Sequence, residues 1–119
     1  MSNHLGVPGY SVQQVGQMLQ DDPQLLLLDV RETQELALAN LGPTVVHAPM
    51  SELAARGLAA LPEEVMADKA AEIIVFCHHG VRSAQVTAWL RQNGFSSAMN
   101  MDGGIDAFAT LVDASVGVY

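Results

Sequence analysis

Short apolar runs alternate along the chain with segments in which apolar residues recur at helical spacing. The clearest run is Ile-Ile-Val-Phe at 73–76, which ends at Cys77, and a second run is the four leucines at 25–28. Unbroken apolar runs of this length are typical of strands buried on both faces of a parallel sheet. Further short strands are predicted at 45–48 and 98–101.

Between these runs, apolar residues recur every three or four positions, which is typical of helices with one buried face. Ser11 and Ser51 stand where two of these helices would begin, and Asn93-Gly94 stands where a third would end. The predicted helical segments are 12–20, 32–38, 51–60, the stretch around 86–90, and 105–111, with 62–71 as either a further helix or a surface connection.

This alternation of strands and helices indicates an α/β fold in which a parallel sheet is covered by helices. The 119 residues are the length of one ordinary domain, and no internal repeat or low-complexity linker divides them. Half of the residues are apolar, which is enough to form a core without disulfides or metal ions. We therefore predict a single domain over residues 1–119.

The charge balance excludes two classes of partner. Five Lys and Arg residues against thirteen Asp and Glu residues leave a net charge of -8, the wrong sign for binding nucleic acid or an anionic membrane surface. No apolar stretch is long enough to span a bilayer, and the first ten residues lack the basic and apolar regions of a targeting signal. We therefore expect a cytoplasmic protein, in which a free thiol also persists.

Cys77 is the candidate for chemistry. As the single cysteine of the sequence, it cannot close an intramolecular disulfide or build a zinc ribbon. It ends the strongest predicted strand and opens a loop, 78–83, that leads into a helix. Ligands of parallel sheets bind beyond the carboxyl ends of the strands, and a helix N-terminus directs free N–H groups and partial positive charge there. We predict that Cys77 ionises readily and acts as a nucleophile.

The loop residues support this prediction in different ways. Gly80 lets the backbone bend toward the sulfur, and the charge of Arg82 favours a thiolate. Ser83 either caps the next helix or donates its hydroxyl to a bound anion. His78 and His79 would make anion capture pH-dependent, but we expect no metal site, because adjacent residues of a tight loop rarely face one centre. The alternative is an inert buried cysteine, which the loop argues against.

The same residues carry a resemblance to a known family. In the right order from about Tyr10 to Leu111, the chain resembles a single-domain rhodanese, a sulfurtransferase. The matching segments are 28–32 (Leu-Asp-Val-Arg-Glu), 47–49 (His-Ala-Pro), 51–53 (Ser-Glu-Leu), 77–83 (Cys-His-His-Gly-Val-Arg-Ser), 93–95 (Asn-Gly-Phe) and 100–105 (Asn-Met-Asp-Gly-Gly-Ile). The family's Gly-His-Ile-Pro-Gly-Ala stretch corresponds here to 39–44, which has no histidine and one extra residue.

The resemblance implies a rhodanese-like domain, with its core at about 10–111, on a five-stranded parallel sheet with helices on both faces. It also implies that Cys77 takes a sulfane sulfur from a small anionic donor such as thiosulfate and becomes a persulfide. The sulfur then passes to cyanide or to a thiol or protein acceptor, and no metal or organic cofactor is required. The residues that would bind the donor are His78, His79, Gly80, Val81, Arg82 and Ser83.

Further charged residues lie beside the first matching segment. Asp29 is expected to orient a loop through backbone hydrogen bonds. Arg31 either pairs with a carboxylate or helps to attract an anionic donor to Cys77. Glu32 and Glu35 are predicted to form a solvated helix face.

Two other functions share the architecture that the resemblance implies. Rhodanese-like phosphatases of the cell-cycle type and related arsenate reductases place five residues between Cys and Arg. Here four residues separate Cys77 from Arg82, which favours a smaller pocket suited to one sulfur atom. The other function is that of a non-catalytic docking or regulatory module, against which the intact Cys77 and Arg82 argue. Sulfur transfer is therefore the leading prediction.

Overall fold

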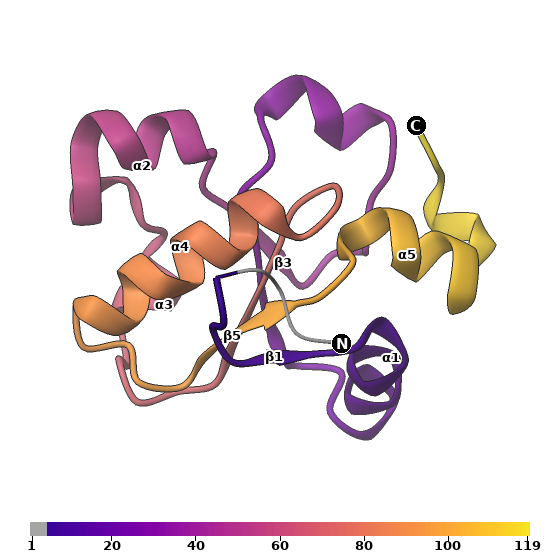
Figure 1. Cartoon of the computed structure of the whole chain (residues 1–119), viewed down its shortest axis with the longest axis horizontal. Coiled ribbons are helices and arrows are strands. Elements are labelled where there is room, and N and C mark those ends of the chain that lie inside the picture. Colours follow the sequence, from indigo (N-terminus) through magenta and orange to yellow (C-terminus); the bar gives the residue numbers. More distant parts are fainter. Residues whose placement is uncertain (1–4) are drawn as a thin grey trace.

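A computed structural model describes residues 5–119. The expectation that residues 1–10 carry no targeting signal therefore falls partly on residues 1–4, which lie outside the described part of the chain. At its centre is a parallel sheet (Figure 1) made of β1 (Gly9–Tyr10), β2 (Leu26–Asp29), β3 (Val45–His47), β4 (Ile73–Phe76) and β5 (Ala98–Met101). The strand order is β1-β5-β4-β2-β3, and every neighbouring pair is parallel. The predicted five-stranded parallel sheet is confirmed, and β4 is its central strand.

Helices join the strands and cover both faces of the sheet. They are α1 (Val12–Asp21), α2 (Met50–Arg56), α3 (Glu63–Met66), α4 (Val81–Gln92) and α5 (Gly104–Leu111), with short 3-10 helices at Thr33–Ala37, Gly57–Ala60 and Ala114–Val116. Figure 1 shows α2, α3 and α4 on one side of the sheet and α1 and α5 on the other. Within residues 5–119, no helix is long and apolar enough to cross a membrane.

The sheet separates two apolar clusters, because successive side chains of a strand point to opposite faces. In β4, Ile73 and Val75 join the cluster that includes side chains of α2, α3 and α4. Ile74 and Phe76 join the cluster that includes side chains of α1 and α5. All four residues are fully buried, and burial of one such side chain stabilises the fold by about 1.5–3 kcal/mol. Packing on both faces of the sheet therefore fixes the position of β4 and of Cys77, which directly follows it.

Local hydrogen bonds set the start of α1, as predicted. The Ser11 hydroxyl accepts the Gln14 N–H at 3.1 Å, and the Gln14 side chain accepts the Ser11 N–H at 2.8 Å. This reciprocal pair satisfies two N–H groups at the start of the helix.

The predicted Ser51 cap is wrong, and the predicted helix to about Ala60 is divided into α2 and the 3-10 helix Gly57–Ala60. α2 begins at Met50, one residue after Pro49, so Ser51 already lies inside the first turn. It ends at Arg56, because Gly57 has a φ of +60°, which is outside the helical range.

Candidate active site

Cys77 directly follows β4 at the carboxyl edge of the sheet and is 1% exposed. Its sulfur accepts the backbone N–H of Gly80 at 3.1 Å and that of Ser83 at 3.3 Å. The Ser83 hydroxyl oxygen lies 3.4 Å from the same sulfur. These donors converge at the N-terminus of α4, where the helix dipole adds partial positive charge. The arrangement therefore stabilises a negative charge on the sulfur without a direct side-chain cation.

Gly80 gives the loop its shape. It precedes the first residue of α4, Val81, and has a φ of +94°, in the left-handed region that glycine adopts without steric cost. Because α4 begins at Val81, Ser83 lies within the first turn, and the alternative that Ser83 caps this helix is wrong. The sulfur of Cys77 takes the role of the cap by accepting a first-turn N–H group.

The start of α5 holds the loop from outside. The N–H groups of Ile105 and Asp106 donate to the carbonyls of Cys77 at 2.9 Å and His78 at 3.0 Å. Gly104 permits this close approach, because its φ is +69° and a Cβ there would lie only 2.7 Å from the Cys77 carbonyl oxygen. The hydrogen bonds from α5 therefore fix the carbonyl groups at the start of the loop. The N–H groups of Gly80 and Ser83 face the sulfur instead.

Asn100 holds the loop from the neighbouring strand β5. Its buried side-chain amide donates to the Gly80 carbonyl at 3.3 Å and to the Asp102 carboxylate at 2.8 Å. Sequence reasoning placed Asn100 and Asp102 in a family motif but assigned them no role. The signal for the role was their position, since Asn100 is the next-to-last residue of β5, the strand beside β4, and Asp102 directly follows that strand.

Arg82 is paired with a carboxylate. Its two terminal nitrogens donate to Glu35 at 2.7 and 3.0 Å. These hydrogen bonds hold the pKa of Glu35 at about 2, below its ordinary 4.5, and they raise the pKa of Arg82. The prediction that Glu32 and Glu35 form a solvated face is wrong, because Glu35 binds Arg82 and Glu32 accepts the hydroxyl of Ser51.

Asp29 and Arg31 form a second ion pair, which is fully buried. The guanidinium donates through Nε at 3.0 Å and through Nη2 at 2.8 Å to the two carboxylate oxygens. Its other donors reach the carbonyls of Glu35 and Ala39 and the hydroxyl of Tyr119. Asp29 also accepts the Arg31 backbone N–H at 3.0 Å. Arg31 therefore pairs with a carboxylate, and its guanidinium braces the turn after β2.

Tyr119 covers the histidine side of the loop, a contact that sequence reasoning missed. Its ring stacks on His78 with centroids 3.8 Å apart and planes only 7° from parallel, and the His79 ring lies 3.9 Å from that of His78. The phenol donates to Glu35 at 2.8 Å and accepts from Arg31 at 3.1 Å. Tyr119 therefore links both ion pairs to the loop.

The low pKa of Glu35 gives the first prediction. Folding lowers this pKa from 4.5 to about 2, so the Glu35–Arg82 pair stabilises the protein fully above pH 4.5, and this contribution is lost as the pH falls toward 2. At pH 7, Glu35→Gln is expected to lower the free energy of unfolding by about 2 kcal/mol. Urea unfolding at pH 7, 4 and 2.5 measures the difference, which should shrink as the pH falls. A difference independent of pH would contradict the assignment.

The family described as rhodanese-like domain matches residues 11–111, most of the chain. The chain belongs to the rhodanese family. This rhodanese domain is 32% identical over 95 residues to a sulfurtransferase of Allochromatium vinosum, a match that covers 80% of the domain and 81% of the relative. It is also 32% identical over 91 residues to the tRNA uridine(34) hydroxylase of Sodalis glossinidius, but it spans only 25% of that protein's length.

Solved structures agree with the fold of this rhodanese domain. A human single-domain sulfurtransferase superposes with a TM-score of 0.70 at 27% identity, covering 89% of the domain and 98% of the human chain. A possible tyrosine phosphatase of Rhodopseudomonas palustris has a TM-score of 0.74 at 15% identity, covering 95% of the domain and 85% of that chain, and this shows a shared fold alone. The sulfurtransferases among these proteins support a sulfurtransferase-type activity.

Proposed function

We propose that this rhodanese domain transfers sulfur through a persulfide on Cys77. The observation that carries the proposal is the position of the Cys77 sulfur, which accepts the N–H groups of Gly80 and Ser83 at the start of α4. A thiolate held by such donors is a competent nucleophile. The same donors would also stabilise the negative charge of a Cys77 persulfide.

The proposed reaction has two halves, written here for thiosulfate as donor. The Cys77 thiolate attacks the outer sulfur of thiosulfate, the sulfur–sulfur bond of the donor breaks, and sulfite leaves with the bonding electron pair. An acceptor, either cyanide or a small-molecule or protein thiol, then attacks the outer sulfur of the persulfide and releases the Cys77 thiolate. Neither half requires a cofactor or an external oxidant.

Roles for the other residues follow from their contacts. Gly80 and Ser83 supply the N–H donors, and Val81 and Arg82 complete the turn that aims these donors at the sulfur. His78 and His79 form one wall of the site under Tyr119. Asp29 and Arg31 are positioning residues that brace the neighbouring turn. We also propose the cytoplasm as the location, because a free thiol persists in a reducing compartment.

Two alternatives receive less support from the site. Phosphatase or arsenate chemistry needs cations for an oxyanion with several charges, whereas Arg82 is already paired with Glu35. A docking module needs no pair of backbone N–H donors directed at a thiol. The activity of the tRNA hydroxylase relative is not carried over, because a net charge of -8 disfavours binding to tRNA.

Intact mass of the purified domain tests the proposal. After incubation with thiosulfate or, in a second sample, with benzyl persulfide, the wild-type chain is expected to gain one sulfur atom, about 32 Da, because a nucleophilic thiol retains the transferred sulfur. Cyanide should remove the added mass, and Cys77→Ser should never gain it. If the wild type gains no sulfur from either donor, the proposal is wrong and the docking module becomes the leading alternative.

A further inference from the structure

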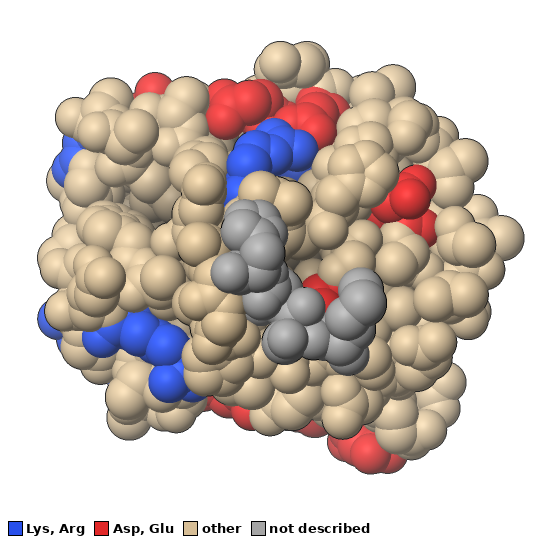
Figure 2. All heavy atoms as spheres, viewed as in Figure 1, with Lys and Arg blue, Asp and Glu red and all other residues tan. Residues whose placement is uncertain are grey.

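The basic side chains of this domain are all engaged. Arg31, Arg56 and Arg82 pair with the carboxylates of Asp29, Glu52 and Glu35. The remaining two of the five, Lys69 and Arg91, donate to backbone carbonyls. On the face shown in Figure 2, the basic patch near the upper edge lies directly against acidic side chains, and most of the surface is uncharged. Within residues 5–119, a doubly negative donor such as thiosulfate therefore meets no unpaired Lys or Arg side chain.

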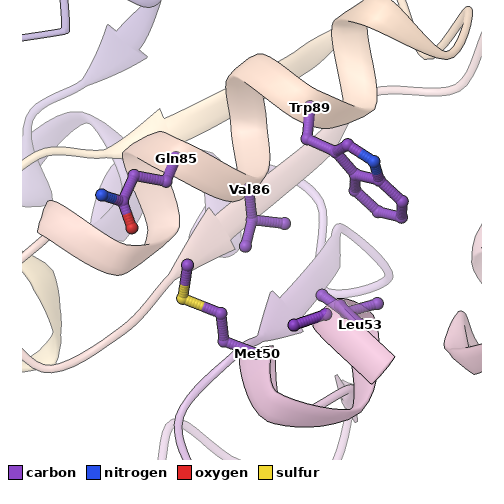
Figure 3. A pocket seen from close by; sticks show the side chains of 6 residues that line it. Met50, Leu53, Gln85, Val86 and Trp89 are labelled. Atoms are coloured by element: carbon purple, nitrogen blue, oxygen red, sulfur yellow. The ribbon is translucent and has the colours of Figure 1, made fainter. Parts of the chain in front are cut away.

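An apolar pocket lies between α2 and α4. Its volume is about 150 Å³, and its lining residues are Met50, Leu53, Ala54, Gln85, Val86 and Trp89. Figure 3 shows Met50 and Leu53 on one helix facing Gln85, Val86 and Trp89 on the other. None of the six carries a charge, and their polar side-chain groups are the amide of Gln85 and the indole N–H of Trp89 (Figure 3). An apolar cavity of about this volume holds one benzene-sized group.

The pocket is close to the reactive sulfur. Ser83, whose N–H binds the sulfur, and Val86, which lines the pocket, are three residues apart on one face of α4. Val86 and Cys77 belong to the same apolar cluster, against which Met50 and Trp89 also pack. Val86, which lines the pocket, therefore lies about one helical turn, ~5 Å along the axis of α4, from Ser83, which binds the sulfur.

We propose that the preferred sulfur donor is an organic persulfide whose apolar group occupies this pocket, an inference that rests on the proposed function. The Cys77 thiolate attacks the outer sulfur of R–S–SH, and the bond between the two sulfurs of the donor breaks. R–S⁻ leaves with the electron pair, and Cys77 retains the outer sulfur and its proton as a persulfide. Atoms and electrons balance without another reactant.

Loading rates with three donors test this inference. Rates of sulfur gain on Cys77 are measured by mass for methyl persulfide, benzyl persulfide and thiosulfate, and each persulfide rate is also divided by the rate at which the same persulfide reacts with free cysteine. Wild type is expected to load from benzyl persulfide at least about tenfold faster than from methyl persulfide, since added apolar groups in a hydrophobic pocket typically change rates by about 10- to 200-fold. Thiosulfate is expected to be the slowest donor.

A matched pair of variants assigns this preference to the pocket. Ala54 and Ala55 are both exposed on α2, but only Ala54 lines the pocket. Ala54→Phe is expected to fill the pocket and abolish the preference for the benzyl donor, whereas Ala55→Phe should keep it. Thermal unfolding shows whether each variant is folded, and Ala54→Leu replaces Ala54→Phe if the latter is not.

Each outcome has a defined meaning. Equal normalised rates for methyl and benzyl persulfide in the wild type, or an unchanged preference in the folded Ala54 variant, would overturn the pocket assignment alone. The fastest loading from thiosulfate would also overturn it and leave sulfur transfer intact. Failure of all three donors to load Cys77 would overturn the proposed function and this inference with it.

Discussion

Gly104→Ala is expected to lower the free energy of unfolding by about 4 kcal/mol, which is at the upper end for a single substitution. Gly104 has a φ of +69°, and a Cβ there would lie 2.7 Å from the carbonyl oxygen of Cys77 and closer still to that of His78. Both atoms are backbone, so neither can rotate away as a flexible side chain would. Moving them breaks the hydrogen bonds that Ile105 and Asp106 donate to the loop.

The control variant Gly94→Ala shows how much of the effect of Gly104→Ala comes from the steric clash and how much from backbone strain. Gly94 has a comparable φ of +92°, but the atoms nearest to its Cβ would be those of the flexible Lys69 side chain at 3.6 Å. Only the strain of the left-handed conformation remains, which costs about 1–2 kcal/mol. Urea unfolding of both variants measures the difference, and equal losses would refute the close approach of α5 to the loop. Slower sulfur loading is also expected for Gly104→Ala where it is folded.

Arg31→Met is expected to lower the free energy of unfolding by about 4 kcal/mol, because it leaves the carboxylate of Asp29 buried without its cation. Asp29 is 1% exposed and Arg31 is fully buried. The guanidinium also satisfies the carbonyls of Glu35 and Ala39, which lose their donors in the variant. Arg31→Lys retains the charge but loses the planar fork, so it should recover only part of the loss.

A double variant tests whether the uncompensated charge is the cause. Asp29→Asn combined with Arg31→Met removes both charges and is expected to be more stable than Arg31→Met alone. Free energies of unfolding from urea titrations at pH 7 provide the comparison. A double variant that loses the sum of the two single losses would show that the two side chains act independently, contrary to the bidentate contact.

The sequence predicts the sheet better than it predicts the connections. Unbroken apolar runs identify β2 and β4, because strands buried on both faces need no polar positions. β1 contains only Gly9 and Tyr10, too few residues to show any periodicity. The start of α2 was misplaced because Ser51 has the chemistry of a cap, whereas its hydroxyl binds Glu32 of another segment. A tertiary contact overrode the local preference there.

In the candidate site, too, features formed by neighbouring residues were predicted, whereas contacts between residues distant in the sequence were not. Cys77 and the loop after it are contiguous, so their convergence on a helix N-terminus follows from strand and helix order. The partners of Arg82 do not follow, because Glu35 lies 47 residues away and its pairing depends on how the turn after β2 folds back. Tyr119 is 84 residues from Glu35, and no pattern in the chain connects the two. Charge and spacing in the sequence therefore indicated that the Arg82 cation is available to Cys77, whereas in the fold Arg82 forms an ion pair with Glu35 that has no net charge.

Cys77 and Tyr119, which covers the loop after it, belong to parts of the molecule with different local stability. β4 is buried along its whole length between β2 and β5, so its amide hydrogens should exchange with solvent only when the domain unfolds globally. Tyr119 follows a short 3-10 helix and the exposed Val118, and such a segment opens locally at a much lower free energy. Opening of residues 114–119 therefore uncovers the histidine side of the loop while the sulfur keeps its position.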